Sequence, residues 1–350
     1  IGYISPPLQP SSKEAIPRKK MQFNTNNFIT QSIHSKLTHF DELAIQLYNH
    51  QVQHNEVFGR YLSMINENKL ASSINALKFL PINFFKTLPV TTDHFTPEVI
   101  FTSSATTGNT PSKHLVANHW VYEKSYQTAF ELFYGPATDY TFLCLLPNYL
   151  ERQGSSLVDM AQGLINASQN TASGFYLYDF DKLAQTLTQL NKEGKKVFLL
   201  GVTFALIDFA EQFPMQLSEQ VIVMETGGMK GRKEEQTRAE IHTYLKQQLG
   251  VTQIHSEYGM TELLSQAYSK GNGIFSCPPW MQIVITDPND PFCILPTGKA
   301  GIINVIDLAN VSSCAFIQTQ DLGRLLPDGQ FEVLGRMDYS ETRGCNLMYV

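Results

Sequence analysis

The chain has 350 residues, a formal net charge of −6 and 43% hydrophobic residues, a composition typical of a soluble globular protein with a sizeable core. The mild excess of acidic residues argues against nucleic acid or an anionic membrane as the main partner. No uninterrupted apolar run reaches 18 residues, so the sequence predicts no transmembrane span.

The first twenty residues are polar and rich in proline, serine and lysine, and they lack the apolar segment of a signal peptide. We expect residues 1–25 to form a flexible N-terminal extension. The five cysteines form no metal-like pairs, which favours a reducing cytoplasmic location. Four of them lie in or near strand-like runs and are expected to be buried and inert: Cys144, Cys277, Cys293 and Cys314.

Residues 36–65 carry apolar side chains at helical spacing. A short strand at 98–101 then leads into TSSATTGNTPSK, residues 102–113. This stretch has little side-chain bulk and many polar hydrogens. It can fold around a polyphosphate, with backbone N–H groups and hydroxyls donating and Lys113 supplying positive charge. The alternative is an ordinary surface loop, and the spacing is not that of a Walker A loop.

A helical stretch at 117–134 follows, and from residue 141 strands and helices alternate. The strands are expected at 141–147, 196–201, 220–226 and 252–258, and the helices at 156–168, 180–194, 203–213 and 234–248. This alternation predicts an α/β domain with a largely parallel sheet, over residues 26–270.

Two loops of this domain follow strands directly. ETGGMKGR, residues 225–232, has adjacent glycines that allow a ligand to approach the backbone, although a plain strand–helix connection explains it equally well. EYGMTE, residues 257–262, has Gly259 for a tight turn, Tyr258 as a flat face for a base, Thr261 as a phosphate donor and Glu262 as a Mg²⁺ ligand. The alternative is a helix N-cap at Thr261.

After residue 265 short strands alternate with turns, which predicts a β-rich subdomain with antiparallel pairing over residues 271–350. Asp321 is expected to end one strand and to accept hydrogen bonds from the ribose hydroxyls. A hairpin turn at 327–329 precedes the next strand, and Arg336 lies at the end of that strand. The pairing of the two strands can therefore bring Asp321 and Arg336 to the same opening of the site. A structural Asp–Arg ion pair is the competing explanation.

Taken in order, these four features resemble the adenylate-forming superfamily of acyl and aryl ligases. Three segments resemble its acyl-protein synthetase branch, the fatty-acid-activating component of bacterial bioluminescence: LLPNYLERQGSSLVDM (145–160), METGGMKGR (224–232) and GRMDYSETRGCNLMYV (335–350). The resemblance covers roughly residues 30–350. It implies an α/β fold like the N-terminal domain of these ligases, with parallel sheets, helices and a β-rich subdomain, and without their C-terminal lid domain.

The resemblance also implies roles for individual residues and the use of ATP and Mg²⁺. The loop that embraces the ATP phosphates would contain Ser103, Ser104, Thr106, Thr107, Gly108 and Lys113. The remaining nucleotide contacts would come from Gly227 and Gly228 at adenine, Tyr258 and Gly259 near the base, Thr261 at phosphate, Glu262 at Mg²⁺, and Asp321 and Arg336 at ribose. The family loop usually has glycine where this chain has Ala105, so either that position is not left-handed or ATP binding is weakened.

The larger ligases continue into a lid that carries a lysine for adenylation, whereas this sequence continues for fourteen residues after Arg336. Lys113 or a residue of a partner would then supply that charge, or the reaction would run without it. Cys345 lies five residues from the end of the sequence, behind Arg343 and Gly344, where a thiol of lowered pKa on a short tail can attack an acyl-adenylate. The alternative is an incidental cysteine without a chemical role.

The sequence therefore predicts an ATP-dependent ligase that activates a carboxylic acid, of fatty type, as acyl-AMP and transfers it to Cys345 for an acyl-protein reductase. Two alternatives stay open. One is an acyl- or aryl-CoA ligase similar to the phenylacetate-CoA ligases. The other is a non-catalytic scaffold that binds nucleotide or a partner.

Overall fold

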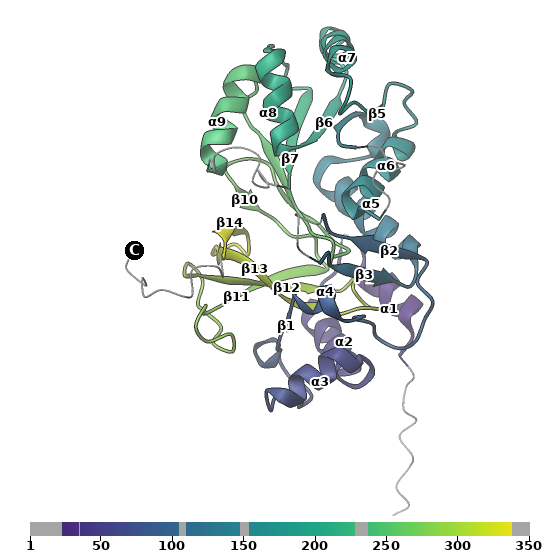
Figure 1. The fold of residues 1–350 in the computed structure, drawn as a ribbon, viewed down its shortest axis with the longest axis vertical. Coiled ribbons are helices and arrows are strands. Elements are labelled where there is room, and N and C mark those ends of the chain that lie inside the picture. The colour runs from purple at the N-terminus through teal and green to yellow at the C-terminus, as the bar shows by residue number, and fades with distance from the viewer. Residues whose placement is uncertain (1–22, 35, 105–109, 148–153, 228–236, 338–350) are drawn as a thin grey trace, which may run out of the picture.

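The computed structural model describes residues 23–34, 36–104, 110–147, 154–227 and 237–337. Two sheets organise this part of the chain (Figure 1). The first, with its helices, lies in the teal and green upper part of the view. The second, yellow-green, lies below it, and the purple N-terminal helices cover the lower side of the second sheet.

The first sheet has the strand order β5-β4-β6-β7-β8-β9, and only the β8–β9 pair of this order is antiparallel. Its strands are β4 (Thr141–Leu145), β5 (Gly174–Phe175), β6 (Val197–Val202), β7 (Val221–Thr226), β8 (His255–Tyr258) and β9 (Ala267–Ser269). The central strands are short apolar runs, and β4 is buried at every position. Such runs suit a parallel sheet that is covered on both faces. The predicted α/β alternation is confirmed.

Helices connect these strands. They are α5 (His119–Tyr134), the 3₁₀ turn η2 (Ala137–Asp139), α6 (Ser156–Ser168), α7 (Phe180–Lys192), α8 (Thr203–Gln212) and α9 (Arg238–Leu249). Side-chain caps fix their starts: the Ser155 hydroxyl accepts from the Val158 N–H at α6, and Thr237 forms a capping box with Glu240 at α9. The cap at Thr237 explains why α9 begins at Arg238, later than the predicted residue 234.

The second sheet is mainly antiparallel, as predicted, with the order β10-β14-β13-β12-β11 and with β1 parallel to β13. Its strands are β1 (Leu80–Pro81), β10 (Ile274–Phe275), β11 (Met281–Thr286), β12 (Ala300–Asp307), β13 (Phe316–Leu325) and β14 (Phe331–Arg336). A hairpin turn joins β13 to β14, and Gly329 supplies its left-handed residue at φ +82°.

The N-terminal helices are α1 (Thr25–Ser32), α2 (Phe40–His54), α3 (Glu56–Met64), the 3₁₀ turn η1 (Ile74–Ala76) and α4 (Phe84–Thr87). Gln51 ties α2 to the β12–β13 connection, because its buried amide donates to the carbonyls of Asn310, Val311 and Ser313 and accepts from the Ala315 N–H. Among the described helices, none combines the length and the apolar character needed to cross a membrane.

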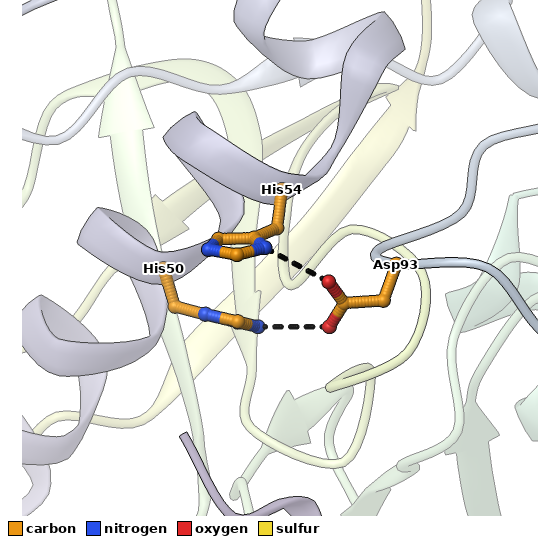
Figure 2. A group of neighbouring side chains, drawn as sticks. All are labelled: His50, His54 and Asp93. Carbon is orange, nitrogen blue, oxygen red and sulfur yellow. Dashed lines mark hydrogen bonds and ion pairs between the residues drawn. The ribbon is translucent and has the colours of Figure 1, made fainter. Parts of the chain in front are cut away.

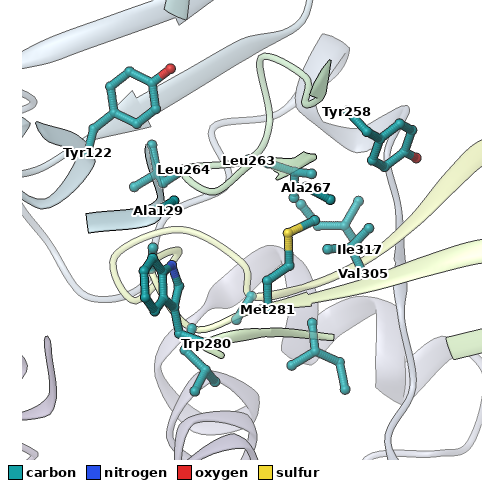
Figure 3. Close-up of a cluster of buried hydrophobic side chains, with 14 of the residues drawn as sticks. Tyr122, Ala129, Tyr258, Leu263, Leu264, Ala267, Trp280, Met281, Val305 and Ile317 are labelled. Carbon is teal, nitrogen blue, oxygen red and sulfur yellow. The ribbon is translucent and has the colours of Figure 1, made fainter. Parts of the chain in front are cut away.

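One hydrophobic core runs from the N-terminal helices through the second sheet to one face of the first sheet. Figure 3 shows its centre, where Trp280 and Met281 lie beneath Leu263 and Leu264. Burying side chains of this size stabilises the fold by about 1.5–3 kcal/mol each. The Trp280 indole N–H is satisfied by the hydroxyls of Ser125 and Ser265, at 3.1 and 3.0 Å. The core therefore fixes the two sheets relative to one another.

Candidate nucleotide-binding site

A β-hairpin holds the two ends of the hydroxyl-rich loop, the TSSATTGNTPSK stretch at residues 102–113. Strand β2 (Val99–Thr102) pairs with β3 (Lys113–Val116), and Thr102 lies opposite Lys113. Ser103 and Ser112 close the base of the loop, because the Ser103 N–H donates to the Ser112 carbonyl and the Ser112 N–H donates to the Ser103 hydroxyl, at 3.1 and 2.9 Å. The predicted feeding strand is confirmed. Ser104 is half-buried at the start of the loop. Ala105, Thr106, Thr107 and Gly108 lie outside the described residues.

The segment after the next strand packs against this hairpin. The Thr102 N–H donates to the Gly154 carbonyl at 2.6 Å, and Gly154 adopts φ +78° with its Cα facing the Ile100 carbonyl. A side chain there would lie 3.1 Å from that carbonyl. The end of the LERQGSS segment therefore borders the hydroxyl loop, and its Ser155 caps α6.

The EYGMTE motif lies beside the same loop. Strand β8 ends at Tyr258, and the described chain then turns and enters β9 without a helix, so the alternative of a helix N-cap at Thr261 is wrong. The Thr261 carbonyl accepts a hydrogen bond of 2.9 Å from Nδ1 of His114, whose Nε2 lies 2.8 Å from the Ser313 hydroxyl. Burial lowers the pKa of His114 to about 4, so this imidazole is neutral. His114 thus holds the motif in place.

Glu262 is a carboxyl group with only 6% of its surface exposed. Burial raises the pKa of Glu262, while a hydrogen bond from the Ser112 side chain and the charges of Arg336 and Lys86 act in the opposite direction. The Ser112 contact joins the hydroxyl loop to the EYGMTE motif. A buried carboxylate next to a hydroxyl oxygen is a donor set that suits Mg²⁺, because the ion would restore the charged form of the carboxylate.

Tyr258, Asp321 and Arg336 meet at the junction of the two sheets. Asp321 and Arg336 are paired residues of β13 and β14, and Nε of Arg336 lies 4.0 Å from Oδ1 of Asp321. The Tyr258 hydroxyl donates to Oδ2 of Asp321 at 2.9 Å. The expectation that Asp321 ends a strand is wrong, since β13 continues to Leu325 through its pairing with β14. Arg336 does end β14, and 70% of its side chain is exposed.

The glycine-rich loop after β7 begins at Gly227, which adopts φ +79°, a conformation that favours glycine. Gly228 lies outside the described residues. Gly259 lies close to the Glu257 carboxyl: an added Cβ would be 2.2 Å from Oε1. A side chain at position 259 would therefore displace the Glu257 carboxyl group, whereas at position 227 it is the backbone conformation that favours glycine.

Glu225 is a buried acid and Glu257 is a half-buried one, and no sequence motif assigned a role to either. Burial and, to a lesser extent, the Glu225 charge raise the pKa of Glu257 to about 7, against a hydrogen bond from the Thr226 hydroxyl. Burial also raises the pKa of Glu225, but contacts with His242, Arg238 and two hydroxyls outweigh it and the pKa is lowered. The two acids come from the neighbouring strands β7 and β8, and their pKa values shift in opposite directions. The only indication of Glu225 and Glu257 in the sequence is that they begin the two quoted motifs, ETGGMKGR and EYGMTE.

Lys113 is exposed, whereas the next residue on β3, His114, is buried. Lys113 therefore lies on the opposite face of the strand from the His114 contact, and it forms no ion pair with another described residue. Cys144 and Cys314 are buried, and burial raises the pKa of each thiol to about 12. Cys277 is half-buried, but Cys293 is exposed, so the expectation that it is buried is wrong. Cys345 lies outside the described residues.

Comparison with known proteins identifies the family and the fold. The family model of acyl-protein synthetases, LuxE, matches residues 165–349. No curated protein sequence matches the chain. The structure is similar to ATP-bound MatB from Rhodopseudomonas palustris, with 18% identity and a TM-score of 0.52, over 70% of this chain and 49% of MatB.

It is also similar to a double mutant of o-succinylbenzoate CoA synthetase (MenE) from Bacillus subtilis, with 17% identity and a TM-score of 0.50, over 70% of this chain and 50% of MenE. The chain thus spans about half the length of the solved structures it matches. These likenesses confirm the predicted fold, that of the adenylate-forming enzymes.

Proposed function

Because the chain belongs to the acyl-protein synthetase family, we propose that it is an ATP-dependent, AMP-forming acid–thiol ligase that works in a reducing, cytoplasmic environment. The observation that carries the proposal is the convergence of separate segments at one place. Ser112 contacts Glu262, and Tyr258 contacts Asp321 beside Arg336. Hydroxyl, carboxylate and guanidinium groups so arranged are the chemistry that a magnesium nucleotide requires.

In the proposed complex the hydroxyl-rich loop, including Ser103, Ser104, Thr106, Thr107 and Gly108, surrounds the phosphates, and Thr261 donates to them. Asp321 accepts from the ribose hydroxyls, with Arg336 beside it. Gly227, Gly228 and Gly259 leave room for adenine next to Tyr258. Glu262 holds Mg²⁺, which neutralises phosphate charge when bound.

The first step joins the acid to AMP. A carboxylate oxygen of the substrate attacks the α-phosphorus of ATP, the bond from that phosphorus to the bridging oxygen breaks, and pyrophosphate leaves with the electron pair. Hydrogen-bond donors of the hydroxyl-rich loop stabilise the charge that develops on the phosphates. The exposed side chain of Lys113 lies at the end of the hydroxyl-rich loop and adds positive charge there.

The second step transfers the acyl group. The thiolate of Cys345 attacks the acyl carbonyl carbon, the bond to the AMP oxygen breaks, and a thioester forms while AMP leaves. The thiol proton is released to solvent. An acyl-protein reductase would then receive the thioester, and a fatty acid is the proposed substrate.

Intact-mass measurement after incubation with ATP, Mg²⁺ and a panel of fatty acids tests this proposal. We expect one acyl adduct, labile to hydroxylamine, which is lost in Cys345→Ser. Cys293→Ser is the matched control, because Cys293 is the exposed cysteine among the described residues, and it should keep the adduct. Free acyl-CoA in the presence of coenzyme A, without any adduct, would instead indicate a CoA ligase. Absence of ATP–pyrophosphate exchange with every acid would indicate a scaffold.

A further inference from the structure

Three potential metal ligands meet on the outer face of the N-terminal helices, at a place that the nucleotide site does not use. His50 and His54 stand four residues apart at the end of α2, and Asp93 lies on the segment between α4 and β2 (Figure 2). Nε2 of His50 lies 3.2 Å from Oδ2 of Asp93, and Nδ1 of His54 lies 2.8 Å from Oδ1. One ligand atom of each residue lies within 4.8 Å of those of the other two.

The backbone holds the carboxylate at this position. Asp93 adopts φ +62°, a left-handed conformation that aspartate tolerates better than most residues, and its N–H donates to the His54 carbonyl at 3.0 Å. The preceding Thr92 is anchored in turn, because its N–H donates to the Ser312 carbonyl at 2.9 Å. The carboxylate is therefore fixed above the end of α2 rather than carried on a free loop.

The two imidazoles are also held. Their rings stack at 4.3 Å with an interplanar angle of 23°, and Phe23 stacks on the other side of His50 at 4.1 Å and 7°. Residues four apart on a helix project from the same face, which is why two histidines at this spacing can bind one ion. All three ligands thus come from elements whose positions are already set.

The chemistry of the donors selects the class of ion. Two imidazole nitrogens and one carboxylate suit Zn²⁺ and its transition-metal neighbours, whereas Mg²⁺ and Ca²⁺ prefer an all-oxygen set. His54 and Asp93 are 47% and 53% exposed, so water can complete the coordination shell. We propose that His50, His54 and Asp93 form a binding site for a divalent transition-metal ion, with Zn²⁺ as the preferred occupant, which clamps the end of α2 to the segment leading into β2.

The same geometry has a simpler explanation, in which each imidazole donates one hydrogen bond to the carboxylate and no ion binds. Calorimetric titration of the chelator-treated full-length protein with Zn²⁺ separates the two. A cobalt titration followed by absorption reports whether thiolates take part, because cobalt–thiolate bonds absorb in the near ultraviolet.

We expect one equivalent of Zn²⁺ to bind without thiolate absorption, and its affinity to fall at least about tenfold in both His54→Gln and Asp93→Asn. Asparagine tolerates the left-handed backbone of position 93, and both side chains are exposed, so these variants should fold. His39→Gln is the matched control, since His39 is exposed at the other end of the same helix, and it should bind like the parent. The proposal would be overturned if the parent failed to bind Zn²⁺, or if the two site variants bound Zn²⁺ with the affinity of the parent.

Discussion

The Tyr258 hydroxyl donates a 2.9 Å hydrogen bond to the Asp321 carboxylate across 63 residues of sequence. Tyr258 ends a strand of the first sheet, and Asp321 lies within β13 of the second. The bond therefore links the two sheets at the place where we propose that ATP binds. It also leaves Oδ1 of Asp321 facing Arg336 at 4.0 Å, so the tyrosine orients the carboxylate that is proposed to accept from ribose.

Replacing Tyr258 by phenylalanine removes this hydrogen bond and keeps the ring packed against Phe275 and Phe331. A lost hydrogen bond to a charged group costs about 1.5–3 kcal/mol, so we expect the KM for ATP to rise about tenfold or more in pyrophosphate exchange, with a smaller change in kcat. The exposed Tyr178 provides the control as Tyr178→Phe. An unchanged KM for ATP in Tyr258→Phe would exclude an orienting role.

Glu262→Gln should separate stability from activity. Burial raises the pKa of Glu262, so a neutral amide of the same shape should leave the free energy of unfolding unchanged or higher. Loss of the carboxylate that is proposed to hold Mg²⁺ should reduce pyrophosphate exchange by about 100-fold or more. Thermal unfolding and exchange rates are measured on the same preparation. A variant that is folded and fully active would remove Glu262 from the proposed mechanism.

The pH dependence of stability should report Glu257. Its pKa is raised from 4.5 to about 7 in the folded protein, so the native state keeps a proton that the unfolded chain releases. The stability contributed by this group is therefore present below pH 4.5 and falls as the pH rises to about 7. Glu257→Gln lacks this loss, and its stability relative to the parent should increase over that window by roughly 3 kcal/mol at most.

Urea unfolding at pH 5 and pH 8 measures the difference for Glu257→Gln. Other titrating groups, such as His114 and Asp307, are present in both proteins and cancel when the two are compared. The exposed Glu219 serves as control, and Glu219→Gln should differ from the parent equally at both pH values. A Glu257→Gln difference that is also constant with pH would show that the carboxyl titrates normally.

His114→Ala should be among the most destabilising substitutions in the hairpin. His114 is 1% exposed and contacts the Thr261 carbonyl and the Ser313 hydroxyl, and the alanine variant leaves both groups without a partner beside a cavity. We expect the free energy of unfolding to fall by about 2–4 kcal/mol in urea denaturation. His94→Ala changes an exposed histidine and should stay close to the parent. A similarly small effect at His114 would contradict its anchoring role.

The sequence predicted the regular elements well where local signals agree. The helix at 156–168 was placed at its observed bounds, since a periodic apolar stripe follows the capping Ser155. It did not predict β1, which is two residues long and therefore too short to show an alternating pattern. It also missed β3, which follows the hydroxyl-rich loop in the sequence.

For the proposed site, the motifs predicted Tyr258, Glu262, Asp321 and Arg336. They also predicted that Asp321 and Arg336 meet through the hairpin, but not that Tyr258 contacts Asp321. The contact between Tyr258 and Asp321 joins different sheets, and no local pattern encodes such a pairing. The raised pKa of Glu257 and the exposure of Cys293 were missed for the same reason, because both depend on what the rest of the chain places around them.

The bond from Gln51 to Asn310 has a consequence for how the protein is made, since its two residues are separated by 259 positions. At a synthesis rate of about 5–20 residues per second, roughly 13–52 s pass between the appearance of the two residues on the ribosome. During that time α2 has emerged without the sheet that covers it. The nascent chain therefore carries the uncovered apolar surface of α2 through most of its translation.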